Sequence, residues 1–324
     1  MEKKQKRIVA YVTETCFPET IECVNYVNYA FGWVTMETVL IRSDRQSCLQ
    51  SLADLRNRNG AFKLLVSLQQ RGKDVFCIRS KTPEGRALLA AQCRELVEKF
   101  DLDGIDLDWE YPGIDLSTGE ENCETCREDF IALLEAIRKE LGSEKLLTIA
   151  CGATPFSHRH TDFVRAGQLL DFINIMGYDH NWGKFGQAHH SNLFPSEDGI
   201  GDHSFSTSWC VESLLQQGIP AEKLILGLPF YGYVKGKGAE GALSYQQILD
   251  MLQEEDCELA FDEAARQSYV KQQGEFTVAF DDPRTIQEKA AYVKAMGLGG
   301  LMYWSYAHDD AQGTLRHAVW DALD

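Results

Sequence analysis

Three carboxylic acids occupy every second position in the segment Asp103–Pro112. They are Asp106, Asp108 and Glu110, and the apolar residues Ile105, Leu107 and Trp109 alternate with them. Because successive side chains of a β-strand point to opposite faces, the three acids would share one face of a strand. Burying an unpaired carboxyl group is costly unless it is protonated. Three such groups on an otherwise apolar strand therefore indicate a functional site.

Crowded carboxyl groups cannot all ionise, so they share protons and at least one of their pKa values rises. Such an acid stays protonated near neutral pH and can donate its proton to a leaving glycosidic oxygen. Ordinary retaining glycosidases place a second carboxylate about 5 Å away, across the substrate, as the nucleophile. Acids two residues apart on one strand lie on one side of a substrate. This spacing therefore implies a different nucleophile.

Eight short apolar runs alternate with amphipathic stretches along the chain. The runs are Arg7–Val12, Tyr26–Phe31, Phe62–Leu68, Gly104–Trp109, Leu146–Cys151, Phe172–Met176, Leu224–Phe230 and Gly300–Trp304. Helical periodicity is clearest in Glu84–Phe100 and Arg127–Leu141. Eight such units in 324 residues predict an α/β fold of the (β/α)8 TIM barrel type. A doubly wound sheet is disfavoured, because no Gly-rich phosphate loop follows an early strand.

We expect residues 1–324 to form a single catalytic barrel domain. The connection between the seventh and eighth strands is too long for one helix, since Leu243–Leu252 looks helical and Glu275–Phe280 looks like a strand. Ile286–Met296 then serves as the barrel helix. We therefore predict a small α+β insertion at residues 233–282, beside the mouth of the active site.

The segment Asp103–Glu110 resembles the D-x-x-D-x-D-x-E signature of family 18 glycoside hydrolases, the chitinase family. The resemblance implies that Glu110 protonates the leaving oxygen and that the sugar's own 2-acetamido oxygen attacks the anomeric carbon. An oxazolinium ion forms, and water opens it with retention of configuration. Asp108 would orient the acetamido group, Asp106 would complete the catalytic set, and Asp103 would support it.

Further short motifs in this chain resemble those of the same family. Met176-Gly-Tyr178-Asp179 resembles M-x-Y-D, in which the Tyr hydrogen-bonds the acetamido carbonyl and the Asp shapes the −1 subsite. The resemblance makes Trp304 the floor under that sugar. An aromatic ring suits this place because it covers the apolar C–H groups of a pyranose. The other residues expected to contact substrate are Tyr11, Phe31, Met176, Trp182 and Tyr231.

Two features depart from the family pattern. Ser67-Leu-Gln69-Gln70 stands where relatives have Ser-x-Gly-Gly, and Tyr233 stands where many carry Arg. Ser67 is expected to support Asp106 together with Tyr11. The two Gln side chains could crowd or reshape a subsite, so the preferred length of the glycan stays open.

The resemblance implies hydrolysis of β-1,4 linkages in glycans that contain N-acetylglucosamine, such as chitin or chito-oligosaccharides. Alternatives are an endo-β-N-acetylglucosaminidase acting on N-glycans, a peptidoglycan glucosaminidase, and an inactive chitin-binding lectin. The lectin is disfavoured because the acid Glu110 is present. The exact glycan, the endo or exo mode and the oligomeric state stay open, and neither a metal nor an organic cofactor is expected.

The net charge of −17 disfavours nucleic acid as a partner, since it repels phosphate. It does not repel a neutral polysaccharide. No run is apolar for long enough to predict a membrane span. The ten cysteines form no disulfide framework, and we expect reduced thiols, including the pair Cys123 and Cys126. We therefore expect a cytoplasmic protein, with secretion after loss of a signal peptide as the alternative.

Overall fold

The computed structural model describes residues 6–13, 20–60, 62–115, 118–121, 124–180, 188–196 and 206–323. Eight parallel strands form a closed ring, in which β1 pairs with both β2 and β16. They are β1 (Arg7–Thr13), β2 (Tyr26–Val34), β4 (Lys63–Gln70), β5 (Gly104–Leu107), β8 (Leu146–Gly152), β9 (Phe172–Met176), β10 (Leu224–Pro229) and β16 (Gly300–Trp304). The predicted (β/α)8 TIM barrel is confirmed.

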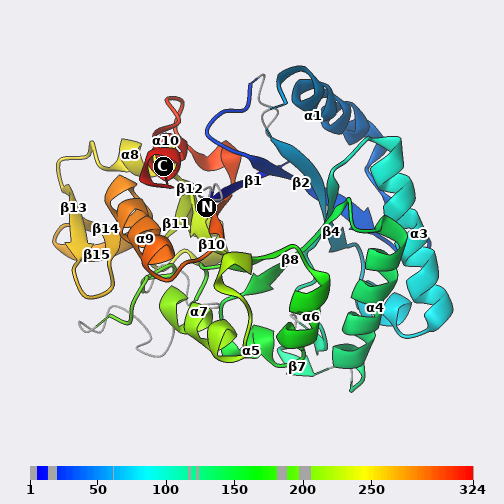
Figure 1. Cartoon of the computed structure of the whole chain (residues 1–324). Coiled ribbons are helices and arrows are strands. Elements are labelled where there is room, and N and C mark those ends of the chain that lie inside the picture. The colour runs from blue at the N-terminus through cyan, green and yellow to red at the C-terminus, as the bar shows by residue number, and fades with distance from the viewer. Residues whose placement is uncertain are drawn as a thin grey trace.

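Helices surround this ring on the outside (Figure 1). They are α1 (Gln46–Asn59), α2 (Val75–Ser80), α3 (Pro83–Lys99), α4 (Cys126–Leu141), α5 (Pro155–His158), α6 (Phe163–Leu169), α7 (Thr207–Gln216), α9 (Pro283–Ala295) and α10 (Thr314–Leu323). Short pairings add β3 (Val39–Leu40) beside β2, and the hairpin of β6 (Ile114–Asp115) and β7 (Glu120–Glu121). The helices cover the outer face of the ring, so a buried polar side chain in the middle of a barrel strand is best placed on the inner face.

The core has two parts, as the alternation of side chains on barrel strands requires. The larger part lies between strands and helices and includes Ile105, Leu107 and Trp109. A smaller apolar cluster fills the interior of the ring, with Val9 and Phe172 among its members. The apolar residues of β5 therefore face the helices, and the acids between them face the interior.

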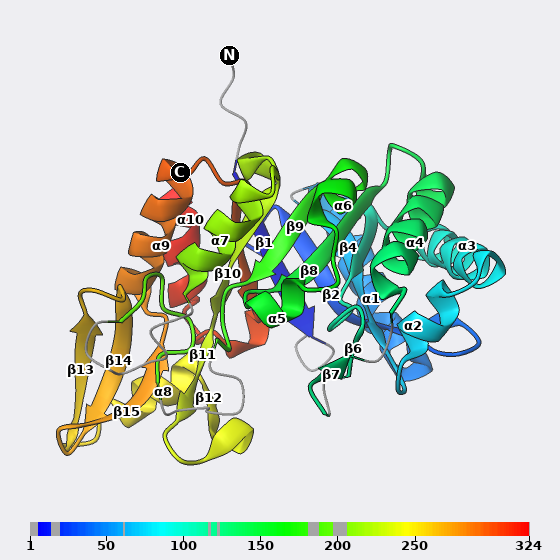
Figure 2. The same cartoon turned by 90° about the horizontal axis from the view of Figure 1, so that it is seen from below.

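The connection between β10 and β16 contains a separate five-stranded antiparallel sheet, in the order β12-β11-β15-β14-β13. Its elements are β11 (Tyr231–Val234), β12 (Ala242–Ser244), α8 (Tyr245–Met251), β13 (Cys257–Asp262), β14 (Gln267–Gln272) and β15 (Glu275–Phe280). Figure 2 shows that this sheet projects beyond the barrel at the same end as the β6–β7 hairpin, away from the N-terminus. Elements of the insertion can therefore contribute to a site at that end.

A buried ion pair joins the insertion to the barrel. Lys289 of α9 lies 2.6 Å from Asp281, which follows β15, and both side chains are fully buried. Ser191 and Gln267 also donate hydrogen bonds to Asp281, at 2.9 and 3.1 Å. The carboxylate is thus shared by α9, β14 and the segment 188–196.

The barrel helix beyond the insertion, α9, begins three residues earlier than the sequence predicts, at Pro283. Asp282 accepts a hydrogen bond from the backbone N–H of Thr285 at 2.8 Å, and Pro283 occupies the first turn of α9. This arrangement is an ordinary N-cap. No helix in the described part of the chain is long and apolar enough to cross a membrane.

The expectation of a free thiol at Cys126 is wrong. This residue begins α4 and is bonded in a disulfide, whereas seven other described cysteines are free. Cys123 lies outside the described residues. Spacing along the chain alone cannot distinguish a bonded cysteine from a free one, because the two sulfur atoms must also have compatible geometry.

Candidate active site

A pocket of about 320 Å³ lies at the C-terminal ends of the barrel strands. It is lined by Phe31, Gln69, Asp108, Glu110, Met176, Tyr178, Asp179, Tyr231, Tyr233, Ala242, Trp304 and His308. These residues come from barrel strands, from the loops that follow them, and from β11 and β12 of the insertion. The C-terminal end is where TIM barrels carry their active sites.

Asp106 lies beneath this pocket and is fully buried. One carboxylate oxygen accepts hydrogen bonds from Tyr11 and Ser67, both at 2.8 Å. The other accepts from Thr148 and from Asn174, the latter at 3.1 Å. Burial raises the pKa of Asp106 although these four donors act in the opposite direction. Asp106 is thus held rigidly below the other two acids.

Asp108 follows the end of β5 and is only 5% exposed. Burial, followed by the nearby charges of Glu110 and Asp106, raises the pKa of Asp108 well above its ordinary value. Its Oδ1 atom is buried and has no hydrogen-bond partner among the described residues. A buried acceptor without a partner is costly, so a donor from a bound substrate would stabilise it.

Glu110 lines the pocket beside Asp108. Burial raises the pKa of Glu110, and the charge of Asp179 acts in the same direction. Hydrogen bonds with Tyr111 and Gln69 oppose this shift without cancelling it. Glu110 therefore keeps its proton to a higher pH than an exposed glutamate, as a general acid requires.

Tyr178 and Asp179 follow the end of β9 on another side of the pocket. Burial raises the pKa of Tyr178 well above its ordinary value, and the charges of Asp179 and Asp108 add to this effect. The phenol of Tyr178 is therefore a neutral hydrogen-bond donor at any physiological pH. Asp179 has a φ of 58°, a left-handed conformation that few residues other than glycine adopt.

Three side chains hold the carboxylate of Asp179. Tyr231 donates to one oxygen at 2.9 Å, and Nδ1 of His190 lies 3.2 Å from the same oxygen. The hydroxyl of Tyr233 donates to the other oxygen at 3.4 Å. Asp179 is therefore occupied by protein donors, in contrast to Asp108.

Aromatic rings form the floor and one wall of the pocket. The ring of Phe31 stacks on Trp304, with centroids 5.5 Å apart and an angle of 22° between the planes. The ring of Tyr11 also contacts Trp304, with the two ring centroids 5.7 Å apart. Met176 also reaches the pocket. Phe31, Met176 and Trp304 together offer an apolar surface of the kind that covers the face of a sugar.

Several predicted residues lie elsewhere than expected. Tyr11 was also predicted to contact substrate, but it does not line the pocket; it lies below it, where it donates to Asp106 as Ser67 does. Asp103 lies at the opposite end of β5, where it forms ion pairs with Arg56 and Lys63 at 2.8 and 2.9 Å. Its expected support for the acidic cluster is wrong, because three further residues of extended chain carry it roughly 10 Å down the barrel.

The two glutamines that replace the expected glycines have different roles. Gln69 enters the pocket and contacts Glu110. Gln70 points away and accepts a hydrogen bond from the backbone of Phe76 at 3.1 Å. Only one of the two side chains therefore reshapes the site. Trp182, predicted to contact substrate, lies outside the described residues.

Sequence reasoning missed four residues around this site. Thr148 and Asn174 are the polar residues within the apolar runs of β8 and β9, and this pattern was a usable signal. His190 and His308 had no comparable signal. Both His189 and His190 are buried, and they face the carboxylates of Asp262 and Asp179 at 3.1 and 3.2 Å.

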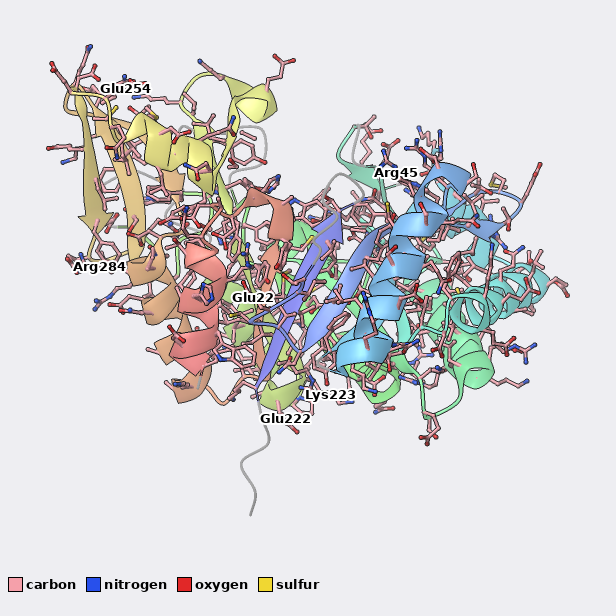
Figure 3. All side chains as sticks on the ribbon, turned by 90° about the horizontal axis from the view of Figure 1, so that it is seen from above. Glu22, Arg45, Glu222, Lys223, Glu254 and Arg284 are labelled. Carbon is pink, nitrogen blue, oxygen red and sulfur yellow. The ribbon has the colours of Figure 1, made fainter. Side chains whose placement is uncertain are left out.

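Within the part of the chain that the structure describes, the side chains that line the pocket form no cluster close enough to hold a metal ion. Among the described residues, the cluster of side chains that could hold a metal ion consists of Glu254, Asp256 and Cys257. These residues lie at the outer end of the insertion, where Figure 3 labels Glu254. Two of the three are exposed, and exposed acidic groups are common without an ion. The arrangement in the pocket instead suits proton transfer and binding of a neutral polar ligand.

Comparison with known proteins identifies the family. Residues 7–309 match glycosyl hydrolases family 18, and the chain belongs to this family. It is 29% identical over 290 residues to Endochitinase 1 of Metarhizium robertsii, covering 82% of this chain and 66% of that protein. It is 28% identical over 302 residues to Chitinase A1 of Niallia circulans, covering 81% and 42%. The chain therefore spans just under two thirds of the length of the first relative and less than half of the second.

Solved structures agree with this assignment. A family 18 N-acetylglucosaminidase from Paenibacillus barengoltzii superimposes with a TM-score of 0.87 at 26% identity. The match covers 98% of this chain and 99% of that one. The resemblance inferred from the acidic segment is thus confirmed at the level of family and fold.

Proposed function

We propose that this protein is a retaining glycoside hydrolase that cleaves β-1,4 linkages in glycans containing N-acetylglucosamine. Chitin fragments and chito-oligosaccharides are the proposed substrates. The two sequence relatives described above support this choice, because both are chitinases. Glu110 would protonate the leaving oxygen, and the substrate's 2-acetamido oxygen would attack the anomeric carbon. Water would then open the oxazolinium ion, with Glu110 acting as the base.

The observation that carries this proposal is the unpartnered, buried Oδ1 of Asp108 beside the raised pKa of Glu110. An acetamido N–H is a donor that matches this acceptor. Forming that bond would orient the carbonyl oxygen of the acetamido group toward the anomeric carbon, and the neutral hydroxyl of Tyr178 could donate to the same group. Asp179 is a poor nucleophile by comparison, because protein donors already occupy both of its oxygens.

A second candidate is release of single N-acetylglucosamine residues from chain ends. It is favoured by the similarity to the Paenibacillus barengoltzii structure, which is that of an N-acetylglucosaminidase. The volume of about 320 Å³ is also at the small end of ligand pockets. The same catalytic residues would serve, and only the extent of the subsites would differ.

The test is a substrate panel with wild type and Glu110→Gln. The panel contains chitotriose, chitotetraose, a high-mannose and a complex N-glycopeptide, and peptidoglycan fragments, with products identified by mass spectrometry. We expect wild type to cleave the chito-oligosaccharides and Glu110→Gln to lose about 10²–10⁴-fold in kcat, the range for loss of general acid catalysis. NMR of the fresh product should show the β-anomer.

Other outcomes would redirect or overturn the proposal. Cleavage only within the chitobiose core of N-glycans, or only of peptidoglycan, would keep the mechanism and change the substrate. Initial release of the α-anomer would contradict retention. Binding of chito-oligosaccharides by both proteins without turnover of any substrate would indicate a lectin and overturn the enzymatic proposal.

A further inference from the structure

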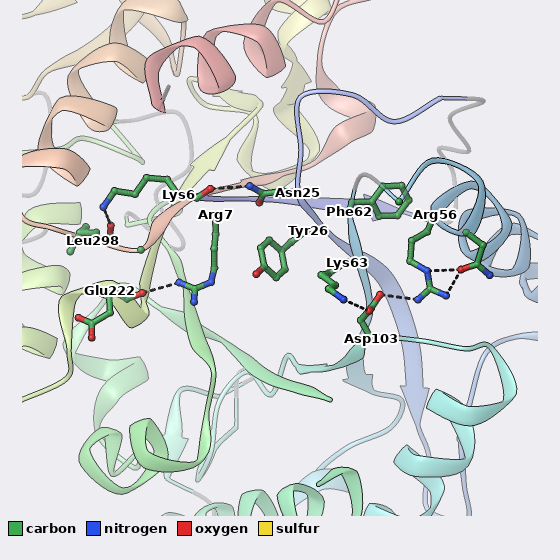
Figure 4. Close-up of a pocket in the computed structure, with 13 residues that line it drawn as sticks. Lys6, Arg7, Asn25, Tyr26, Arg56, Phe62, Lys63, Asp103, Glu222 and Leu298 are labelled. Carbon is green, nitrogen blue, oxygen red and sulfur yellow. Dashed lines mark hydrogen bonds and ion pairs between the residues drawn. The ribbon is translucent and has the colours of Figure 1, made fainter. Parts of the chain in front are cut away.

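A second and larger cavity, of about 680 Å³, opens at the end of the barrel opposite the candidate active site. Its walls come from the starts of β1, β2, β4 and β5 and from the loops that precede β10 and β16. The residues drawn in Figure 4 include four cations, which are Lys6, Arg7, Arg56 and Lys63. The same walls carry two carboxylates, Asp103 and Glu222.

One side of this cavity has balanced charges. Asp103 accepts hydrogen bonds from Arg56 at 2.8 Å, from Lys63 at 2.9 Å and from the backbone of Leu64 at 2.9 Å. Burial alone would raise the pKa of Asp103, but these bonds hold it below its ordinary value. Arg56 and Lys63 are therefore already paired.

On the other side two cations, Lys6 and Arg7, outnumber the one carboxylate, Glu222. Lys6 donates to the backbone carbonyl of Leu298, and Arg7 donates to that of Glu222 at 2.9 Å (Figure 4). Within the described ranges neither cation forms an ion pair. Burial and the nearby charges of Arg7 and Lys294 lower the pKa of Lys6. This local excess of positive charge stands out in a protein with a net charge of −17.

The geometry of Arg7 is fixed in a way that leaves donors available. Its guanidinium carbon lies 5.1 Å from the centre of the Phe172 ring, and the ring of Tyr26 contacts the same phenylalanine at 5.3 Å. Asn25 bonds the backbone of Lys6 at 2.9 Å and that of Ile8 at 2.8 Å, which holds the chain on either side of Arg7. A guanidinium has five N–H donors, and one hydrogen bond of Arg7 is observed here.

We propose that this cavity binds a small multivalent oxyanion of the phosphate type. The guanidinium of Arg7 would bind two of its oxygens, and the ammonium of Lys6 and the hydroxyl of Tyr26 would bind the others. The ligand is either inorganic phosphate or the phosphate group of a small metabolite. It would link β1 and β2 to the loops before β10 and β16, which lie where the ring of strands closes. Because only the folded state has this cavity, the ligand stabilises the fold.

The experiment measures thermal unfolding of the full chain in sodium phosphate and in sodium chloride at matched ionic strength and pH. We expect the Tm of wild type to rise with the logarithm of phosphate concentration beyond the effect of chloride. Arg7→Gln and Lys6→Gln should lose this increment. Lys139→Gln removes an exposed charge on α4 and should keep it. Calorimetric titration with inorganic phosphate and with glucose 6-phosphate then identifies the source, since a site for metabolites binds the ester more tightly.

Equal phosphate increments in wild type and Arg7→Gln, or no increment beyond chloride in wild type, would overturn the proposal. If Arg7→Gln does not fold, Arg7→Lys keeps the charge but loses the two-pronged contact. The expected result is then a phosphate affinity reduced severalfold but measurable. None of these measurements uses glycan hydrolysis, so this proposal and the proposed enzymatic function can fail independently.

Discussion

At the scale of single residues, the site depends on acids whose surroundings differ sharply. Asp106 receives four hydrogen bonds, Asp108 has a buried oxygen without a partner, and Glu110 opens onto the pocket. Three chemically similar groups thus have three environments within five residues of chain. Their burial costs stability, and that cost is an expected property of a site prepared for substrate.

Asp108 should make the stability of the protein depend on pH. Because burial raises its pKa well above 3.8, the folded state keeps a proton that the unfolded chain has already released. The unfolded state then binds fewer protons, so the free energy of unfolding falls as pH rises above this ordinary value. Asp108→Asn removes the titrating group. We expect this variant to gain stability relative to wild type, by about 0.5–2 kcal/mol at pH 7.5 and less at pH 4.5.

Urea unfolding at the two pH values measures this difference. Asp321→Asn, an exposed change in α10, is the matched control and should show the same difference from wild type at both pH values. A stability gain for Asp108→Asn that is equal at pH 4.5 and 7.5 would contradict the argument.

His190 should act on the reaction through Asp179 without touching substrate. Its Nδ1 faces the carboxylate of Asp179 at 3.2 Å, and a carboxylate can only accept, so Nδ1 is the donor. We expect His190→Ala to lower kcat/KM about tenfold, because loss of one hydrogen bond to a charged group costs roughly 1.5 kcal/mol or more.

His190→Asn places an amide donor near the position of Nδ1 and should recover part of the activity. Steady-state kinetics of wild type and both variants, on whichever glycan proves to be the substrate, provide the test. Thermal unfolding of the same samples separates a local effect from a general loss of fold. Equal losses in His190→Ala and His190→Asn would show that the donor is not what matters.

At the scale of elements, the barrel strands position the chemistry and the helix starts fix the strands. Asp282 caps α9, and α9 leads into β16, which carries Trp304. All eight predicted strands occur within a few residues of their expected positions, because buried parallel strands read as short apolar runs. The main difference is β5, which ends at Leu107, so Asp108 and Glu110 lie beyond its paired region.

Removal of this cap should destabilise the fold without altering the chemistry. We expect Asp282→Ala to lower the free energy of unfolding by about 1 kcal/mol, a typical value for an N-cap. Asp282→Ser keeps a capping acceptor and should lose much less. Chemical denaturation gives the stability, and the KM for substrate should stay unchanged. A large rise in KM for Asp282→Ala would indicate that α9 controls the pocket directly.

At the scale of the whole molecule, the insertion and the barrel form the site together. Tyr233 and Ala242 of the insertion line the pocket, and Tyr233 contacts Asp179 of the barrel. The buried ion pair of Lys289 and Asp281 holds the insertion against the barrel. The substrate-binding surface therefore depends on a contact that lies outside the pocket.

Removing only one partner of this ion pair should strongly destabilise the fold. Lys289→Met leaves the carboxylate of Asp281 buried without its cation, and we expect a loss of about 3–5 kcal/mol. The double variant Lys289→Met with Asp281→Leu removes both charges and should recover most of the stability. Urea denaturation of the three proteins measures both effects. A double variant no more stable than Lys289→Met would show that packing, and not the unpaired charge, limits stability here.

The sequence by itself determined the barrel, the family and the acidic strand. Alternation with period two is a local property, so the common orientation of Asp106, Asp108 and Glu110 could be read from one segment. The sequence also showed polar residues at Thr148 and Asn174 within apolar runs, although their hydrogen bonds to Asp106 were not predicted. These features depend on neighbours in the chain, and the physical rules for them are short-range.

Only the tertiary structure decided which distant segments meet and at what height along the barrel. It separated Gln69 from Gln70 and placed Asp103 at the far end of β5. It also buried His190 against Asp179, although the two residues are 11 positions apart in the sequence. The physical reason is that periodicity fixes the face of a side chain within its own element. Contacts between elements are set by packing of the whole molecule, which no local pattern encodes.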